Sequence, residues 1–184
     1  VDADLVCGVP DSGLASAKGY SEESGIPFGL AFHKNSYVGR TFIKPTQKER
    51  ESSVKIKLSV LESVVKGKRI VLVDDSIVRG TTISNLITML RKAGATEVHV
   101  RISSPPFLYP CYFGTDVPSC DQLIAHDHTV SQICELIGAD SLGYLDGERL
   151  PELIEGDTGY CDACFSGNYP VEPPTEDIRG SFEP

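Results

Sequence analysis

A strongly apolar strand that runs directly into two acidic residues is the feature that most constrains this chain. In the segment RIVLVDDSIVRGTT, residues 69–82, four apolar residues precede Asp74 and Asp75, and Gly80 with two threonines follows. Adjacent carboxylates repel each other and raise each other's pKa, so the pair needs a compensating partner. The pattern indicates a ligand site at the end of a buried strand.

Short apolar runs bounded by turn residues predict the strands. Helical patterns lie between several of these runs, so we expect an α/β fold with a mainly parallel sheet flanked by helices. Strands are predicted at residues 5–9, 28–32, 70–73, 98–102, 123–125 and 142–145, and two of the helices at about 12–24 and 130–137.

The clearest helix follows the acidic pair. Ile83, Leu86, Ile87 and Leu90 recur at the spacing of one helical face. Thr82 is the predicted N-cap, and Gly94 is the predicted residue just beyond the end of the helix.

Two strand-end loops are candidates for a common ligand site. VPDSG (9–13) follows the first predicted strand, and DDSIVRGTT (74–82) follows the third. In parallel sheets, ligands bind outside the carboxyl ends of the strands, so both loops should open on one rim. Asp74 and Asp75 suit a diol or a Mg²⁺ ion, and the residues after them suit a phosphate, namely Ser76, Gly80, Thr81 and Thr82. The sequence therefore predicts a Mg²⁺-dependent site for a phosphorylated ribose.

A simpler interpretation is that the two aspartates only cap the next helix and solvate its loop. Capping requires one short polar side chain, whereas here two charges are followed by Gly-Thr-Thr. We therefore favour the ligand site.

A basic segment lies between the two loops. Residues 34–57 carry seven basic residues against two acidic ones, an excess of five positive charges in a chain of net charge −9. Residues 48–57 are equally well explained as a solvated surface helix. The part from Lys34 to Arg40, where Gly39 permits movement, predicts a lid that closes over a polyanionic substrate.

Composition limits the class of protein. The 184 residues, 40% of them hydrophobic, suit one principal core, and no apolar run is long enough to span a membrane. The first residues lack a secretory signal, so we expect a soluble, cytoplasmic protein. The net charge of −9 opposes nucleic-acid binding. In such a compartment the six cysteines are thiols or metal ligands rather than disulfides.

The cysteines divide into two groups. Cys161 and Cys164 form a C-x-x-C motif, which suits zinc, an iron–sulfur cluster or redox chemistry. Three of the four cysteines outside this motif, Cys7, Cys120 and Cys134, are predicted to be buried thiols. His126 and His128 could act as metal ligands, but a surface position is the favoured interpretation.

Several separate segments together resemble a known family. RIVLVDDSIVRGTT resembles the phosphoribosylpyrophosphate (PRPP) motif of type I phosphoribosyltransferases. KNSYVGRTFI, SPPFLYPCYFGTD and CDACFSGNYP are similar to segments of the glutamine PRPP amidotransferase family, and the resemblance extends from Val9 to Pro170. It implies a type I phosphoribosyltransferase fold with an irregular, cysteine-containing C-terminal tail.

The resemblance implies roles for individual residues. Asp74 and Asp75 would bind the ribose hydroxyls and share Mg²⁺ with Ser12. The 5′-phosphate would be held by residues 76–82, which are Ser76, Ile77, Val78, Arg79, Gly80, Thr81 and Thr82. A flexible loop would close over PRPP and contribute Lys34, Tyr37 and Arg40 to catalysis. The implied reaction is displacement of pyrophosphate from C1 of the ribose by ammonia, which gives 5-phosphoribosylamine in the first committed step of purine synthesis.

The resemblance also implies a cluster and a domain plan. Cys111, Cys161 and Cys164 would be three ligands of a [4Fe–4S] cluster, with the fourth upstream of residue 1. Residues 1–156 would be an N-terminally truncated transferase domain and residues 157–184 a cysteine-containing segment and tail. The glutaminase domain of the family is expected to be absent, so the chain itself would use free ammonia at most. The family further implies a homo-oligomer that purine nucleotides inhibit.

Two other classes share some of these features. A receiver domain also has paired acidic residues after a strand, but it does not use an RGTT loop. A non-catalytic PRPP-binding regulator would keep the whole site, and it remains the alternative function. A transcription regulator of that kind needs a DNA-binding element, and an acidic chain without a helix-turn-helix pattern offers none.

Overall fold

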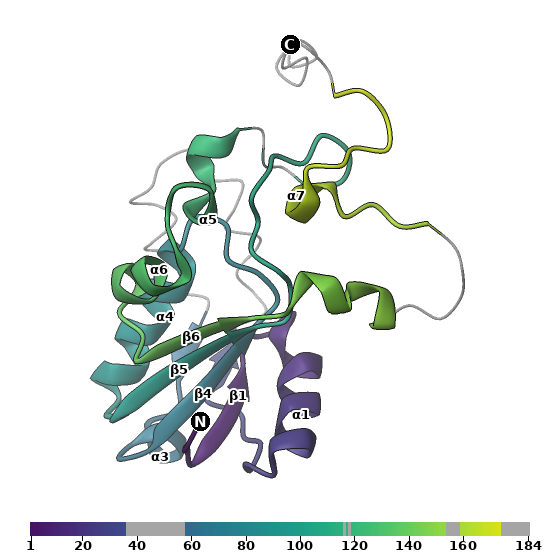
Figure 1. Cartoon of the computed structure of the whole chain (residues 1–184). Coiled ribbons are helices and arrows are strands. Elements are labelled where there is room, and N and C mark those ends of the chain that lie inside the picture. The colour runs from purple at the N-terminus through teal and green to yellow at the C-terminus, as the bar shows by residue number, and fades with distance from the viewer. Residues whose placement is uncertain (36–57, 116, 118, 154–158, 174–184) are drawn as a thin grey trace.

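A four-stranded parallel sheet forms the centre of the protein (Figure 1). The computed structural model describes residues 1–35, 58–115, 117, 119–153 and 159–173. The strands, in their order across the sheet, are β1 (Leu5–Gly8), β4 (Arg69–Asp74), β5 (Glu97–Ile102) and β6 (Ser141–Tyr144). All three neighbouring pairs run parallel, which confirms the predicted sheet.

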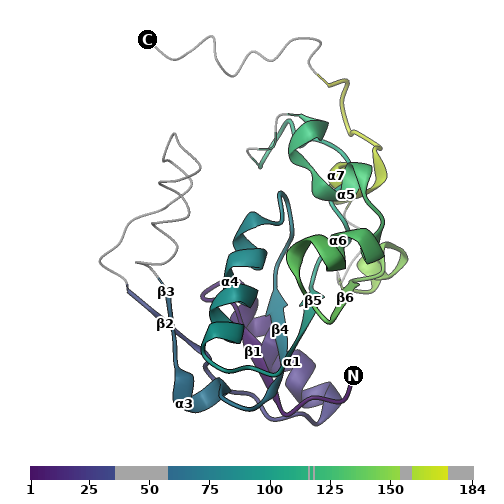
Figure 2. The ribbon, with the colours of Figure 1, turned by 90° about the vertical axis from the view of Figure 1, so that its left-hand side faces the viewer.

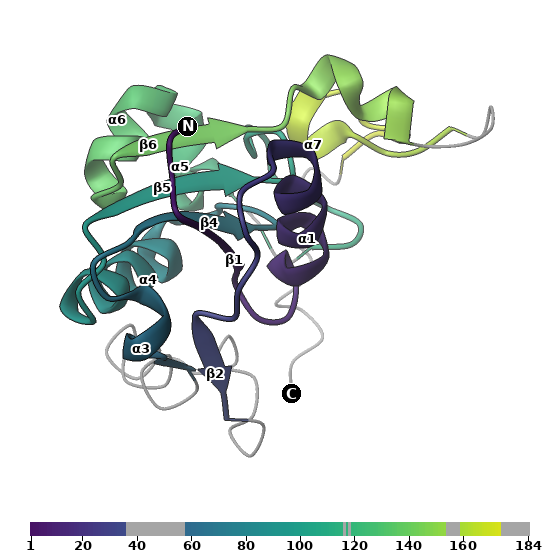
Figure 3. The same ribbon diagram turned by 90° about the horizontal axis from the view of Figure 1, so that it is seen from below.

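Helices cover both faces of this sheet. Helix α1 (Gly13–Ser24) packs on β1 and β4 on one face, whereas α4 (Thr81–Lys92) and α6 (Val130–Ile137) pack beside each other on the other face (Figures 2 and 3). The larger core lies on the α4 side, where all four residues of the predicted helical face are buried. Burial of this stripe is what holds α4 on the sheet.

A small antiparallel sheet lies beside the main one. It pairs β2 (Phe32–Lys34) with β3 (Leu58–Val60), and the short helix α3 (Glu62–Val65) follows. The strand predicted over residues 28–32 is therefore wrong for most of its length, because only its last residue belongs to β2. Phe28 instead forms an isolated bridge with Val6.

Helix ends differ from the prediction by one or two residues. Helix α4 begins at Thr81, and its N-cap is Gly80 rather than Thr82. Gly80 adopts a left-handed conformation at φ 78°, which glycine tolerates best. Gly94 has φ 93°, as expected for a glycine that ends a helix. Helix α6 has the predicted bounds, and Thr129 and Gln132 form a capping box at its start.

The strand predicted over residues 123–125 is wrong. Leu123 follows a 3₁₀ turn (Cys120–Gln122), and the next two residues begin helix α5 (Ile124–Asp127). Leu123 and Ala125 are both buried, so the apolar run did indicate a buried segment. Such a short run does not distinguish a strand from a helical turn.

The described residues of the C-terminal segment contact the domain. After a 3₁₀ helix (Gly147–Leu153), helix α7 (Ala163–Ser166) lies against residues 107–111 (Figure 1). The ring of Phe165 meets that of Phe107 edge-on at 5.0 Å between centroids. The segment is thus less irregular than predicted. In the described part of the chain, no helix is both long and apolar enough to cross a membrane.

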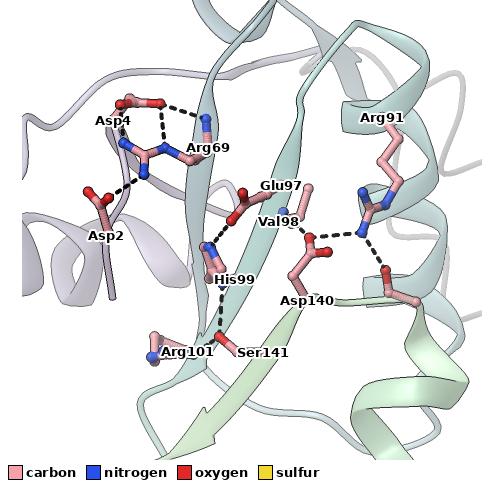
Figure 4. Close-up of polar contacts among 11 residues, drawn as sticks. Asp2, Asp4, Arg69, Arg91, Glu97, Val98, His99, Arg101, Asp140 and Ser141 are labelled. Atoms are coloured by element: carbon pink, nitrogen blue, oxygen red, sulfur yellow. Dashed lines mark hydrogen bonds and ion pairs between the residues drawn. The ribbon is translucent and has the colours of Figure 1, made fainter.

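Polar contacts tie strand ends together at the amino edge of the sheet (Figure 4). The Arg69 guanidinium donates to both carboxylate oxygens of Asp4, at 2.8 and 3.2 Å. Next to β6, the carboxylate of Asp140 accepts hydrogen bonds from the backbone N–H of Val98 and from the guanidinium of Arg91. These contacts fix the edge opposite to the candidate site.

Candidate functional site

The two loops that the sequence singled out meet at one rim of the sheet. Strands β1 and β4 are parallel neighbours, so the loops after them leave the same edge. The hydroxyl of Ser12, just before α1, donates to Oδ1 of Asp74 at 3.5 Å. The predicted juxtaposition of these loops is confirmed.

The two aspartates lie in different environments. Asp74 is buried, with 7% of its surface exposed, whereas Asp75 is exposed. Burial raises the pKa of Asp74 to about 7, and the charge of Asp75 raises it as well, although the backbone N–H of Asp75 and the Ser12 hydroxyl lower it. Among the described residues, no basic side chain forms an ion pair with either carboxylate. A buried carboxylate without a cation is a suitable partner for a divalent ion.

Residues 76–82 form the turn from β4 into α4. The side chain of Ile77 is buried, so this residue can offer a ligand only its backbone. Thr81 and Thr82 are exposed in the first turn of α4, where free backbone N–H groups and the helix dipole favour an anion. Gly80 is required for its left-handed conformation, whereas a Cβ there would come closest to the movable Cδ1 of Ile124, at 2.9 Å.

Other residues of this turn contact the segment around α5. Arg79 pairs with the side-chain oxygen of Gln122. Val78 accepts a backbone hydrogen bond from Ile124 at 2.9 Å. A hollow of about 320 Å³ adjoins Arg79 and is lined by residues 121–124 and 127–128, so it lies beside the acidic pair's loop and not at the acidic pair itself.

Two glycines that sequence reasoning missed allow the rim to form. A Cβ on Gly8 would lie 2.5 Å from the carbonyl oxygen of Gly13, and a Cβ on Gly13 would lie 2.4 Å from the carbonyl oxygen of Val73. The start of α1 therefore touches the end of β4 through bare backbone. Their position on either side of residues 10–12, which we call the PDS loop, could have indicated them in the sequence.

Lys34 reaches this rim from β2. Its ammonium group forms an ion pair with the carboxylate of Asp11, in the loop next to Ser12. Sequence reasoning had not assigned Asp11 a role. Tyr37 and Arg40, which were predicted to act with Lys34, lie outside the described residues, as does most of the basic segment.

Cys111, Cys161 and Cys164 lie in the C-terminal lobe, the name we give to residues 105–117 and 159–173. The Sγ atom of Cys111 accepts backbone N–H groups from Gly114 at 3.4 Å and from Thr115 at 3.3 Å. The carbonyl oxygen of Cys164 accepts from the backbone N–H groups of Leu108 and Tyr109.

The thiols of this lobe influence one another. Burial raises the pKa of Cys111, but backbone N–H groups outweigh it and bring the pKa below its usual value. The pKa of Cys164 is raised to about 11, mainly by burial and in smaller part by the charges of Cys111 and Cys161. Among the described residues, however, no three His, Cys, Asp or Glu side chains are arranged to hold a single metal ion.

The remaining cysteines and histidines agree only in part with the predictions. Cys7 is fully buried, and burial raises the pKa of its thiol to about 12. Cys120 and Cys134 are half-buried, so their predicted burial is wrong. His126 and His128 are exposed, as favoured, although they lie at α5 and its end rather than in a loop.

The parallel sheet, with the acidic pair and the Gly-Thr-Thr turn at its carboxyl edge, defines an α/β domain whose candidate site lies where ligands bind in sheets of this kind. The model of the phosphoribosyl transferase domain matches residues 2–103. The chain belongs to this family, and it has the type I phosphoribosyltransferase fold.

Three relatives illustrate the similarity. The chain is 54% identical over 177 residues to a Bacillus subtilis protein named amidophosphoribosyltransferase, covering 94% of this chain and 37% of the relative. It is 51% identical to a soybean (Glycine max) protein named as chloroplastic amidophosphoribosyltransferase, covering 94% of this chain and 31% of the relative. The solved structure of glutamine PRPP amidotransferase from B. subtilis, described as complexed with ADP and GMP, is 52% identical with a TM-score of 0.82, covering 96% of this chain and 40% of that one.

The chain thus spans between about a third and two fifths of the length of these relatives. The similarity covers the candidate site and the C-terminal lobe alike, since it extends over at least 94% of the chain.

Proposed function

We propose that this chain is the transferase part of an amidophosphoribosyltransferase. In the full-length protein it would displace pyrophosphate from PRPP with ammonia derived from glutamine, giving 5-phosphoribosylamine for purine synthesis. The observation that carries the proposal is the contact between Ser12 and Asp74, which brings the PDS loop and the acidic pair to one rim. The high identity to amidophosphoribosyltransferases over nearly the whole chain supports this activity within the family.

The acidic pair is the proposed sugar and metal site. Asp74 and Asp75 would bind the ribose hydroxyls and, with Ser12, hold Mg²⁺. The residues fit this ion, because Mg²⁺ commonly takes one or two carboxylates and completes its shell with water and substrate oxygens. Bound there, Mg²⁺ would supply positive charge against the two carboxylates and the departing pyrophosphate.

The turn after β4 is the proposed phosphate site. Ser76, Gly80, Thr81 and Thr82 would hold the 5′-phosphate with hydroxyls and backbone N–H groups, and Ile77, Val78 and Arg79 would contribute backbone. This division is supported by the burial of Ile77 and by the pairing of Arg79 with Gln122.

Lys34, Tyr37 and Arg40 are the proposed catalytic residues, because the leaving group is a polyanion. As pyrophosphate departs, C1 gains oxocarbenium character, so the reaction needs cations on the leaving group and exclusion of water rather than a protein nucleophile. The position of the Lys34 ammonium at the rim supports its share in this role.

The C-terminal lobe is the proposed place of a [4Fe–4S] cluster. Cys111, Cys161 and Cys164 would supply three thiolates, and the fourth would come from another part of the full-length protein. Such a cluster is held by four thiolates on separate irons, so its ligands need not converge on one point. The N–H groups directed at Cys111 support a thiolate at that position.

The wider setting of the chain is also a proposal. Residues 1–156 would be the transferase domain and 157–184 the cysteine-containing segment and tail, with glutamine hydrolysis in a separate domain. The protein would be a homo-oligomer that binds purine nucleotides, as the description of the B. subtilis structure with ADP and GMP suggests. We propose a cytoplasmic protein without nucleic-acid partners; in plants, the soybean relative is named as chloroplastic.

Calorimetry with PRPP and Mg²⁺ tests the function on this chain. Asp75→Asn removes an exposed carboxylate from the rim and should weaken PRPP binding by about 10-fold, the loss expected for hydrogen bonds to a charged group. Glu135→Gln, an equally exposed change on α6, should leave binding intact. Absence of binding by the unmodified chain, or equal losses in both variants, would contradict the proposal.

A product assay separates an enzyme from a PRPP-binding regulator. Ammonium is added to the chain with PRPP and Mg²⁺, and released pyrophosphate is measured. Release that depends on ammonium supports the transferase. Tight binding without any release favours the regulatory alternative.

A further inference from the structure

Asp11 and Lys34 form a contact between two parts of the rim that are 23 residues apart. Asp11 belongs to the loop between β1 and α1, immediately before the serine that contacts Asp74. Lys34 is the last residue of β2. No other basic group forms an ion pair with Asp11 in the described residues, so the contact is specific to these two side chains.

The two partners differ in how firmly they are held. The Lys34 backbone is paired with Leu58 of β3, two residues after the buried Phe32, and only 28% of its side chain is exposed. The Asp11 side chain is 71% exposed. The backbone of the lysine is thus held by its strand, whereas the Asp11 side chain is largely exposed to solvent.

The charges around the rim imply that carboxylate and substrate compete for the Lys34 ammonium group. Asp11, Asp74 and Asp75 are three carboxylates in or beside the two loops, and Lys34 forms an ion pair with the first of them. A pyrophosphate group carries more negative charge than one carboxylate and needs the same cation. Exposed ion pairs contribute little to stability, so the lysine can change partners at small cost.

We infer that Asp11 is a positioning residue, which holds the Lys34 ammonium at the rim until the pyrophosphate part of the substrate takes it over. This inference rests on the proposed function and assigns a role to a residue outside its catalytic and metal set. When pyrophosphate leaves after the reaction, Asp11 reclaims the lysine and so favours product release. No bond is made or broken in this exchange.

Binding of pyrophosphate with Mg²⁺ to four forms of the chain tests the exchange by calorimetry. Asp11→Asn keeps the shape of the side chain and frees the lysine, so the dissociation constant should fall by about 3-fold, the upper range for an exposed ion pair. Lys34→Ala should weaken binding. The double variant should match Lys34→Ala alone, because Asp11 acts through the lysine.

Glu22→Gln is the matched control. It removes the same charge and breaks an ion pair with Lys18 on α1 whose side chains are also exposed, at 56% and 66%. It should leave pyrophosphate binding unchanged.

Chemical labelling provides a second measurement without any ligand. Lys34 acylation by a water-soluble ester, followed by mass spectrometry, should be faster in Asp11→Asn than in the unmodified chain. Lys18 should respond to Glu22→Gln but not to Asp11→Asn. Pyrophosphate with Mg²⁺ should protect Lys34 in both the unmodified chain and Asp11→Asn.

Three outcomes count against the inference. If Asp11→Asn also tightened pyrophosphate binding in a chain that carries Lys34→Ala, the loss of charge repulsion would explain the effect. The proposed exchange of the lysine would then be wrong. Unchanged binding and labelling in Asp11→Asn would also overturn it, while PRPP binding by the unmodified chain left the proposed function standing. If the unmodified chain bound neither PRPP nor pyrophosphate, the proposed function would fail first and the inference with it.

Discussion

At the scale of single residues, the acidic pair is divided by burial. Asp74 lies in the last position of β4 and is buried, whereas Asp75 is the first residue beyond the strand and is exposed. The backbone N–H of Asp75 donates to Oδ1 of Asp74 at 2.9 Å. One neighbour therefore bears a desolvation cost that the other avoids, and this asymmetry makes the buried carboxylate sensitive to pH.

Replacement of Asp74 by Asn should stabilise the ligand-free chain at alkaline pH. The pKa of Asp74 is raised from 3.8 to about 7 in the folded protein, so folding favours the protonated form. Stability should fall as pH rises from about 4 to 7, and Asp74→Asn should remove this loss. The free energy of unfolding in urea should be higher for Asp74→Asn by roughly 2–4 kcal/mol at pH 8, with a smaller difference at pH 5.

The control for this measurement is an exposed carboxylate. Glu135→Gln on α6 should change the free energy of unfolding by less than about 0.5 kcal/mol at either pH. A difference between Asp74→Asn and the unmodified chain that did not vary with pH would rule out burial of the charge as the cause.

At the scale of elements, the contact between α1 and the end of β4 decides whether the rim exists. The first residue of α1 is Gly13, whose backbone lies against Val73 and Asp74. The helix can approach this closely only because its first residue has no side chain. The same contact brings Ser12 to Asp74, so packing of the helix and geometry of the site are linked.

Gly13→Ala should destabilise the protein by about 1–3 kcal/mol, the usual cost of forcing atoms into a packed site. Its Cβ would lie 2.4 Å from the carbonyl oxygen of Val73, so α1 must shift outward. Gly19→Ala in the same helix meets nothing within 4 Å and should instead stabilise it by up to about 1 kcal/mol through helix propensity. Urea denaturation compares the two variants, and equal effects would refute the steric argument.

At the scale of the whole molecule, the C-terminal lobe joins distant parts of the chain. The rings of Phe165 and Phe107 meet, and the hydroxyl of Tyr169 donates to the carbonyl oxygen of Pro110 at 2.8 Å. Phe107 and Val117 of this lobe form, together with Leu123, a buried cluster separate from the two cores of the sheet. The lobe should therefore open without unfolding the sheet.

Phe165→Ala should expose this lobe selectively. Hydrogen exchange at the amides of Leu108 and Tyr109, which donate to Cys164, should become faster. The amides of β4 and β5 should keep their protection, and Phe113→Ala, at a ring that is 50% exposed, should have a smaller effect. Equal loss of protection in the lobe and the sheet would show that they unfold together.

A feature of this protein could be predicted from the sequence where its signal lies in neighbouring residues. The face of α4 was visible because its residues repeat at a fixed local spacing, and the predicted bounds of α6 agree with the structure, where Thr129 and Gly138 cap the helix. The strand predicted at residues 123–125 was wrong because three apolar residues carry no period. The burial of Cys120 and Cys134 was overestimated because burial depends on neighbours that are distant in the sequence.

The sequence by itself determined the parallel α/β sheet, its principal helices and the two loops at one rim, because local periodicity and turn residues specify each of these. Only the tertiary structure decided which aspartate is buried, that Gly8 and Gly13 have no room for a side chain, and that Lys34 forms an ion pair with Asp11. The physical reason is that burial, close approach and ion pairing depend on atoms that the chain brings together from distant positions.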